Sequence, residues 1–327
     1  MTRTMDRALR IPLAASLLLP LLITTACAPH LLVAPAAPVA ELPRPDSALT
    51  RTVIVVSVDG LRPDAIATFR APTLSRLIAG GSYTLSARTI MPSKTLPSHT
   101  SMVTGELPDT HGVVWNNAFT HRSGTITIPT IFSEARSRGY MTAAFFSKTK
   151  FSHLQQPHAL DFSQAPGGWF GWWSADKTTD DVEAYLAKQA PNLLFVHLAD
   201  ADAAGHKRGW MSAAYGEAVL RVDTAVARIL AAADRAYGAG TYTLMVTADH
   251  GGHERDHGSD DIRDITIPWI AWGQGVVPGR LPENTVKTTD TAATVLYLLG
   301  IDRPSKWIGS AVTAAFAVAG SAVGGGL

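Results

Sequence analysis

A threonine between two prolines is the first residue whose surroundings suggest chemistry. Thr95 lies in the segment MPSKTLPSHTSMVTG, residues 91–105, between Pro92 and Pro97. Because Pro97 suits the first turn of a helix and Gly105 suits its end, we predict a short helix directly after Thr95. The free N–H groups at a helix start attract anions. A threonine hydroxyl is a poor nucleophile at neutral pH, so Thr95 needs a base or a metal ion to react.

Carboxylates and imidazoles that could bind such a metal ion stand near the ends of predicted strands. The residues with this placement are Asp59, Asp202, His206, Asp249, His250 and His257. Asp59 follows the run TVIVVSV, and Asp202 and His206 follow NLLFVHL. Asp249 and His250 follow TLMVT, and His257 lies in the loop before TIPWIAW. Asp202 and His206 are four residues apart and can share one metal ion if their segment is helical. Mixed carboxylate and imidazole ligands suit zinc, with Mn, Fe and Co as alternatives.

The elements that must position these side chains alternate along the chain. Apolar, β-branched runs predict strands at residues 52–58, 141–146, 192–198, 243–247 and 266–272. Helical spacing and Pro/Gly boundaries predict helices at residues 72–79, 129–138, 212–233 and 291–299. Pro268 places the last of these strands nearer an edge of the sheet. The alternation predicts an α/β fold, a mostly parallel central sheet sandwiched by helices, with the site at the carboxyl ends of the strands.

Composition and charge restrict the partners. The chain has 327 residues, 46% of them hydrophobic, and a net charge of +1. This length fits one large α/β domain or two smaller ones. A net charge so close to zero argues against a polyanion or a membrane surface as partner, and we predict no nucleic-acid-binding patch. We therefore expect a small-molecule substrate, while the oligomeric state is left open.

The first 27 residues have the order of a secretory signal peptide. Arg3, Arg7 and Arg10 precede an apolar run at residues 11–23, and small residues precede Cys27. The segment also resembles a bacterial lipoprotein signal, in which Cys27 would be acylated. We expect an exported bacterial protein, periplasmic or membrane-anchored, that meets the membrane only through an N-terminal lipid anchor; plain export with removal of Cys27 is the alternative. Cys27 is the only cysteine, which excludes an internal disulfide.

The rest of the chain divides into three predicted parts. Residues 28–50 are rich in Pro and Ala and are predicted to form a tether. Residues 51–310 contain the predicted strands and helices and should form the globular domain. Residues 311–327 form a tail of small residues, either frayed or a closing helix.

Six segments occur in an order that resembles a known superfamily: VIVVSVDGLRPDAI, MPSKTLPSHTSMVTG, HGVVWNN, DADAAGH, TADHGGH and HGSDDIRDITIPWIAWG. They resemble the alkaline phosphatase superfamily, and within it the type I phosphodiesterase/nucleotide pyrophosphatase family, over residues 53–309. The resemblance implies an alkaline phosphatase-like fold and a site with two divalent metal ions, zinc by preference. One metal would be held by Asp59, Thr95, Asp249 and His250, and the other by Asp202, His206 and His257. Thr95 would be the nucleophile that forms a covalent phospho-threonine, and Asn116 would donate a hydrogen bond to a phosphoryl oxygen.

The function implied by this resemblance is metal-dependent hydrolysis of phosphodiester or phosphoanhydride bonds in nucleotide-like substrates. The C/S-x-P-x-R motif of sulfatases is missing, since Thr95 stands in place of Cys or Ser and no Arg stands two residues after Leu96-Pro97. With no Arg in the nucleophile segment, we expect diesters to be preferred over monoesters. A phosphonate hydrolase and a phosphomonoesterase are alternatives on the same site, and a lipoprotein binding module with a decayed site is a third. Lys94 could meet the phosphate, and the aromatic run GGWFGWW, residues 167–173, could either stack a flat leaving group or pack internally.

Overall fold

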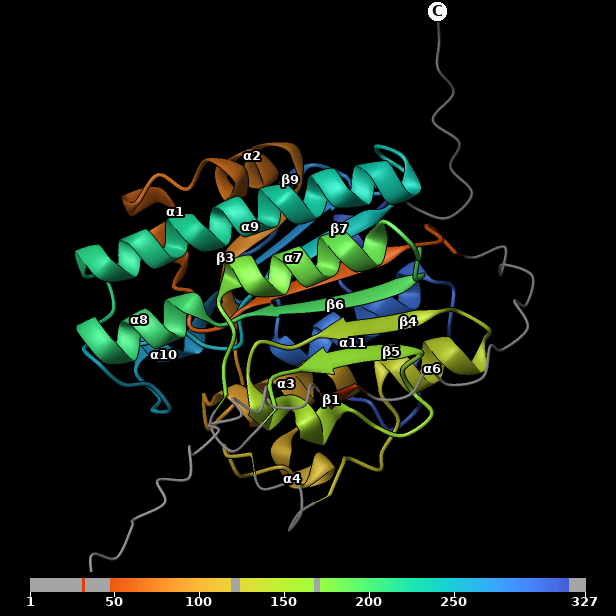
Figure 1. The fold of residues 1–327 in the computed structure, drawn as a ribbon, viewed down its shortest axis with the longest axis horizontal. Helices are drawn as coiled ribbons and strands as arrows, with labels where there is room; N and C mark the ends of the chain where they lie inside the picture. The colour runs from red at the N-terminus through yellow and green to blue at the C-terminus, as the bar shows by residue number, and fades with distance from the viewer. Residues whose placement is uncertain (1–30, 33–47, 119–123, 168–170, 318–327) are drawn as a thin grey trace, which may run out of the picture.

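Continuous apolar runs build the centre of one mixed, mostly parallel β-sheet (Figure 1). The structure is a computed structural model, and it describes residues 31–32, 48–118, 124–167 and 171–317 of the chain. The strand order is β1-β5-β4-β6-β2-β7-β8-β3-β9. The strands are β1 (Leu31–Leu32), β2 (Val53–Val58), β3 (Ser82–Arg88), β4 (Thr142–Phe145), β5 (Phe162–Ala165), β6 (Leu193–Leu198), β7 (Thr243–Thr247), β8 (Thr266–Gly273) and β9 (Gly279–Arg280).

Three neighbouring parallel strands carry the site. Every residue of β2, β6 and β7 is buried. Val55 of β2 pairs with Phe195 of β6 on one side and with Met245 of β7 on the other. A strand covered on both faces has no polar face, which is why these runs consist mostly of apolar residues. Because the three strands point the same way, the residues that follow them, among them Asp59 and Asp249, share one edge of the sheet.

Helices cover both faces of this sheet. One layer contains α1 (Pro63–Thr68), α2 (Pro72–Gly80), α7 (Ala175–Leu186), α8 (Asp200–Arg208) and α9 (Ala213–Tyr237). The other contains α3 (Thr95–Thr104), α4 (Pro108–His111), α6 (Ile131–Ser137) and α11 (Thr288–Leu298). Shorter helices are α10 (Ile262–Ile265), η1 (Thr149–Leu154) and η2 (Thr313–Ala315).

The arrangement of the layers confirms the predicted α/β fold class. α7 and α9 run side by side along the sheet, and α11 lies on the opposite side (Figure 1). The predicted apolar stripe of α9, which includes Val219, Val222 and Val226, is buried. Among the described helices, none is both long enough and apolar enough to cross a membrane.

Pro268 was predicted to mark a strand nearer an edge, and β8 lies third from one end of the described sheet. β8 is paired on both sides, with β7 and β3, and β9 lies beyond β3. The sheet accepts Pro268 because β3 has a bulge opposite it. Thr84 pairs with Trp269 and Ala87 pairs with Ile267, so two residues of β3 face the single proline. The bulge interrupts the ladder where proline lacks an N–H group.

The packed domain extends beyond both boundaries predicted for it. The N–H groups of Leu49 and Thr50 donate to the carbonyl of Leu298. β1, inside the predicted tether, pairs antiparallel with β5. Phe316, inside the predicted tail, is buried. The predicted signal peptide with Cys27 lies outside the described residues.

A carboxylate on α9 caps the start of α2, and we expect its removal to destabilise the fold. Asp223 is buried, with Oδ2 accepting from the N–H of Thr73 (3.0 Å) and Oδ1 from that of Leu74 (2.7 Å). Asp223→Ala leaves two buried donors unpaired, so the free energy of unfolding should fall by about 2–3 kcal/mol. Urea denaturation measures this. Glu217→Ala, at an exposed position of the same helix, is the control; equal stability of the two variants would contradict the capping role.

Candidate metal centre and catalytic site

The first group of candidate ligands meets at the hydroxyl of the predicted nucleophile. Nε2 of His250 lies 3.3 Å from Oδ1 of Asp59, 3.3 Å from Oδ2 of Asp249 and 3.4 Å from Oγ1 of Thr95. All four side chains are buried. Asp59 follows β2, Asp249 and His250 follow the adjacent strand β7, and Thr95 is the first residue of α3. The structure thus brings together the four residues that were predicted to share one metal ion.

The second group surrounds Asp202. Its Oδ1 lies 3.3 Å from Nε2 of His206 and 3.5 Å from Nε2 of His257. Asp202 and His206 are one turn apart on α8, which is the helical turn that their spacing of four residues requires. His257 comes from the loop between β7 and α10. This group is more open than the first, because His206 is exposed.

Hydrogen bonds fix which ring nitrogen each candidate histidine presents. Three Nδ1 atoms each lie 2.8–2.9 Å from a backbone carbonyl oxygen: His250 with Gly251, His206 with Arg255, and His257 with Ser93. A carbonyl oxygen only accepts, so each Nδ1 carries a proton and donates. In the neutral form of each ring, the lone pair is on Nε2, which faces a carboxylate oxygen. Such an arrangement suits a cation between the two.

The buried oxygens and their spacing fit two divalent metal ions. Oδ1 of Asp59, Oδ1 of Asp202 and Oδ2 of Asp249 are buried without a hydrogen-bond partner among the described residues. These are the oxygens that face the histidine Nε2 atoms. Ligand atoms about 2.0–2.1 Å from a tetrahedral zinc ion stand about 3.3–3.4 Å apart; the pairs measured above are 3.3–3.5 Å apart, and the carboxylate and histidine ligand atoms of each group lie within 4.8 Å of one another. Because an unpaired charge in a protein interior is costly, both groups fit metal ions.

A tryptophan packed on two glycines holds the loops that carry the second group. Nε1 of Trp210 donates to the carbonyl of Gly60 in the loop after β2 (2.9 Å). A Cβ atom would come within 2.6 Å of the Trp210 ring at Gly205 and within 2.2 Å at Gly252. The ring also packs edge-on against His206, with ring centroids 5.1 Å apart. Only glycine permits this close approach, and the approach fixes the position of His206.

Asn116 reaches the start of α3. Its Oδ1 accepts from the N–H of Leu96 (2.9 Å) and from Nζ of Lys150 (3.0 Å). Because both bonds use the oxygen, the Nδ2 group of Asn116 is the part that can donate to a ligand. α3 begins at Thr95, and Lys94 before it is exposed. The hydroxyl of Thr95, the helix start and Asn116 therefore lie together, as an anion site requires.

Two lysines and a histidine at the site were not predicted. Nζ of Lys148 lies 2.6 Å from Oδ2 of Asp59 and 2.5 Å from Oδ2 of Asp202, so it bridges the two groups of ligands. Nε2 of His197 lies 2.9 Å from the same oxygen of Asp59. Lys148 and Lys150 follow β4, which is parallel to β6. The expectation that site residues lie at the carboxyl ends of parallel strands, applied to the segment FFSKTK, would have found both lysines.

Electrostatic interactions keep the carboxylate of Asp59 ionised. Burial raises the pKa of Asp59, but the Lys148 ammonium, the hydrogen bond from His197 and the nearby His250 outweigh it and hold that pKa well below its usual range. Burial opposes protonation of His250, but Asp249 and Asp59 outweigh it and raise its pKa to about 9, so a metal ion bound at Nε2 would replace a proton there. The site therefore concentrates negative charge on oxygens suited to a cation.

A hollow of about 290 Å³ opens beside the centre. Its walls include Asn116, Lys148, Lys150 and Ala203, together with Trp172, which is 51% exposed. Trp172 belongs to the aromatic run predicted to stack or pack, of which residues 168–170 lie outside the described part of the chain. The hollow thus offers two ammonium groups and an aromatic ring next to the candidate ligands.

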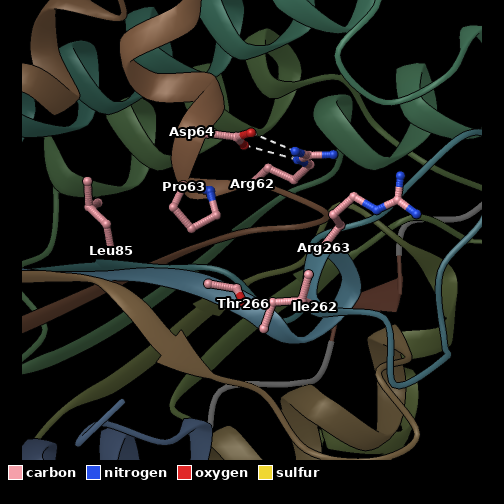
Figure 2. Close-up of a pocket in the computed structure, with 7 residues that line it drawn as sticks. All are labelled: Arg62, Pro63, Asp64, Leu85, Ile262, Arg263 and Thr266. Atoms are coloured by element: carbon pink, nitrogen blue, oxygen red, sulfur yellow. Dashed lines mark hydrogen bonds and ion pairs between the residues drawn. The ribbon is translucent and has the colours of Figure 1, made fainter. Parts of the chain in front are cut away.

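Another hollow, of about 310 Å³, lies between the start of α1 and α10 (Figure 2). Figure 2 shows Arg62 and Asp64 pointing toward each other, and their nearest atoms are 2.5 Å apart. Leu85 and Ile262 form its apolar part. None of the residues that line it is a candidate ligand or nucleophile, so we place the candidate site at the hollow beside Lys148.

Curated proteins match more than half of the chain. GPI ethanolamine phosphate transferase 1 of Candida glabrata is 24% identical over 303 residues, which cover 79% of this chain and 33% of that protein. Ectonucleotide pyrophosphatase/phosphodiesterase family member 1 of Mus musculus is 25% identical over 210 residues, which cover 54% of this chain and 21% of that protein. The chain thus spans a third or less of the length of these curated relatives.

Solved structures share the fold at lower identity. Murine ectonucleotide pyrophosphatase/phosphodiesterase 5 aligns with a TM-score of 0.65 and 16% identity, covering 77% of this chain and 96% of that one. The alkaline phosphatase PafA aligns with a TM-score of 0.65 and 13% identity, covering 84% of this chain and 100% of that one. At these identities the likeness establishes an alkaline phosphatase-like fold.

The comparisons contradict the predicted localisation. The curated relatives come from fungi, mouse and rat, and point to a eukaryotic rather than a bacterial protein. The prediction of a bacterial periplasmic protein or membrane-anchored lipoprotein is therefore wrong. It depended only on residues 1–27, whose order of basic, apolar and small residues describes secretory signals in general.

The segments that suggested a resemblance also satisfy a family model. That model, described as type I phosphodiesterase / nucleotide pyrophosphatase, matches residues 53–270. The match includes β2, α3, β6, α8 and β7, which carry the nucleophile and both groups of ligands. With more than half of the sequence matched and the fold of the superfamily in place, the chain belongs to the type I phosphodiesterase/nucleotide pyrophosphatase family.

Proposed function

We propose that the protein hydrolyses phosphodiester or phosphoanhydride bonds of nucleotide-like substrates through a covalent intermediate on Thr95. The observation that carries this proposal is the position of the Thr95 hydroxyl, 3.4 Å from Nε2 of His250, which is grouped with Asp59 and Asp249 as a candidate metal ligand. Family membership supports it. The inactive form of murine ectonucleotide pyrophosphatase/phosphodiesterase 5, in complex with AMP, carries a threonine-to-alanine change.

The proposed reaction has two steps. Two divalent metal ions, zinc by preference and held by the two groups of ligands, would lower the pKa of the Thr95 hydroxyl and balance the charge of the phosphoryl group. The Thr95 oxygen attacks phosphorus, the bond to the leaving group breaks, and the phosphoryl group becomes attached to Thr95. Asn116 donates from its Nδ2 group to a phosphoryl oxygen, together with N–H groups at the start of α3. Water then releases the phosphoryl group and restores the hydroxyl.

A phosphomonoesterase is the second candidate function, and the two lysines favour it. A monoester carries one more negative charge than a diester and gains more from a nearby cation. The expected preference for diesters rested on the lack of Arg beside Thr95. The structure brings Lys148 and Lys150 to the same place from a distant segment. The same lysines would also favour a phosphoanhydride, whose second phosphate is anionic.

Lys150→Met should separate these substrates. A charge-assisted hydrogen bond contributes about 1.5–3 kcal/mol, so kcat/KM for a monoester or a nucleoside polyphosphate should fall by about 10- to 100-fold, with little change for an aryl diester. Burial and the charge of Lys148 lower the pKa of Lys150 to about 8. Its contribution is therefore present below that pH and lost as the pH rises through it. An equal loss for all three substrates would contradict a charge contact.

The decisive experiment combines a substrate panel with trapping of the intermediate. Purified protein with its metal content measured is offered an aryl diester, a nucleoside polyphosphate, a monoester and a phosphonate, with and without an added alcohol. We expect the diester or the polyphosphate to give the highest kcat/KM, and mass spectrometry of acid-quenched protein to find the adduct on Thr95. The alcohol tests for transfer, which the similarity to GPI ethanolamine phosphate transferase 1 suggests. Protein with two bound metals and no turnover of any substrate would favour a decayed binding module.

His257→Ala should remove one metal ion selectively. His257 faces Asp202, whereas the first group of ligands does not include it. Metal analysis after gel filtration should therefore find about one metal ion per chain instead of about two, because one of three protein ligands to the second ion is lost. Loss of both ions, or retention of both, would show that the ligands are not divided into these two groups.

A further inference from the structure

We propose that His197 is a positioning residue for the metal centre, holding Oδ2 of Asp59 so that Oδ1 of the same carboxylate faces His250. The inference rests on the proposed function, because it concerns the ligand geometry of the first metal group. His197 lies within β6 and is fully buried. It pairs in register with Ser57 of β2, two residues before Asp59.

The tautomer of His197 is opposite to that of the candidate ligands. The N–H of Ser147 donates to Nδ1 of His197 (3.3 Å). A backbone N–H can only donate, so Nδ1 is the acceptor and the ring proton is on Nε2. That proton points to Oδ2 of Asp59 at 2.9 Å. The three candidate ligands instead donate from Nδ1 and present Nε2 as a lone pair. His197 is thus a donor to the carboxylate, where the others are suited to bind a cation.

The surroundings hold both the ring and the carboxylate in place. The His197 ring packs against Phe151, with centroids 4.3 Å apart, and against His99, with centroids 4.9 Å apart. Oδ2 of Asp59 is shared by His197 and by Nζ of Lys148 at 2.6 Å. Oδ1 is the oxygen without a hydrogen-bond partner among the described residues. Two donors on one oxygen therefore direct the other oxygen toward His250.

A pair of substitutions tests the donor itself. In His197→Gln the side-chain amide nitrogen can take nearly the place of Nε2, so a donor to Asp59 remains. In His197→Asn the shorter amide reaches only as far as Nδ1, and the donor is lost. Partners that orient metal ligands typically change metal affinity by about 10- to 100-fold. We expect His197→Asn to weaken zinc binding by this factor at the first group alone, and His197→Gln to bind close to wild type.

His111→Asn is the matched control. His111 is also buried, its Nδ1 accepts from the N–H of Val113 (3.1 Å), and its Nε2 faces Oγ of Ser101 (3.0 Å). It therefore has the same tautomer as His197 but contacts a serine instead of a carboxylate. Zinc affinities are measured by competition with a chromophoric chelator, and the absorption bands of bound cobalt report the geometry of each site. Both readouts should be unchanged in His111→Asn.

The outcomes distinguish this inference from the proposed function. Wild-type protein that binds no zinc overturns the proposed function. Wild-type protein that binds two zinc ions, with His197→Asn binding them equally well, overturns only the role of His197. Equal loss of zinc affinity in His197→Gln and His197→Asn also overturns only the role of His197. A similar loss of zinc affinity in the control His111→Asn has the same meaning. If His197→Asn does not fold, ¹⁵N NMR of the wild-type protein at pH 7 decides: a proton on Nδ1 of His197 overturns the proposal, and a proton on Nε2 alone supports it.

Discussion

Thr95→Ala should lose about four to six orders of magnitude in kcat/KM for a phosphodiester, the scale of loss when a covalent nucleophile is removed. The fold should survive, because the change removes one hydroxyl and one methyl group at the first residue of α3. Much of the metal should survive as well, because Asp59, Asp249 and His250 still offer three ligands to the first ion. Metal content and circular dichroism, measured beside kcat/KM, separate a lost nucleophile from a lost centre.

Thr95→Ser is the matched partner of that variant. The serine hydroxyl keeps the nucleophilic oxygen and lacks only the methyl group that restricts the rotamer. We expect partial activity, well above that of Thr95→Ala, and a phosphoryl adduct at the same position after acid quenching. Near wild-type rates in Thr95→Ala, with two metal ions bound, would remove Thr95 from the mechanism.

Most candidate ligands were accessible from the sequence because they lie shortly after recognisable strands. β2, β6 and β7 are continuous apolar runs, and their parallel order brings Asp59, Asp202 and Asp249 to one edge of the sheet. The fold class followed from the same runs. That inference needs only the direction of each strand, and no knowledge of side-chain contacts.

The residues that hold those ligands were not accessible in the same way. His197 lies inside an apolar run, and only the register between β6 and β2 reveals that it stands beside Asp59. The position of Lys148 after β4 places it at this edge of the sheet, but no spacing in the sequence encodes its contacts with Asp59, which follows β2, and Asp202, which lies on α8. α7 was missed because its sequence, ADKTTDDVEAYL, is mostly polar, and β3 because its sequence, SYTLSAR, contains no continuous apolar run. Contacts between distant segments determine both the residues that hold the ligands and the helix and strand that were missed.

Removal of the metal ions should abolish activity and also destabilise the fold. Chelation followed by removal of the chelator should leave no measurable turnover, and added zinc should restore it. An ion that binds only the folded protein stabilises it by about 4 kcal/mol when its free concentration is 1,000 times the dissociation constant. The melting temperature should therefore fall on chelation and recover with zinc.

The charges at the centre explain the expected loss of stability. Without the two ions, the ammonium of Lys148 contacts the buried carboxylates of Asp59 and Asp202, while no lysine among the described residues forms an ion pair with the buried carboxylate of Asp249. A chelator saturated with zinc beforehand is the control, because it cannot extract metal and should change neither turnover nor melting temperature. Fully active protein with fewer than two metal ions per chain would contradict the two-metal mechanism. Loss of activity without a fall in melting temperature would instead show that the ions do not bind the buried carboxylate oxygens, because removal of ions from those oxygens should destabilise the fold.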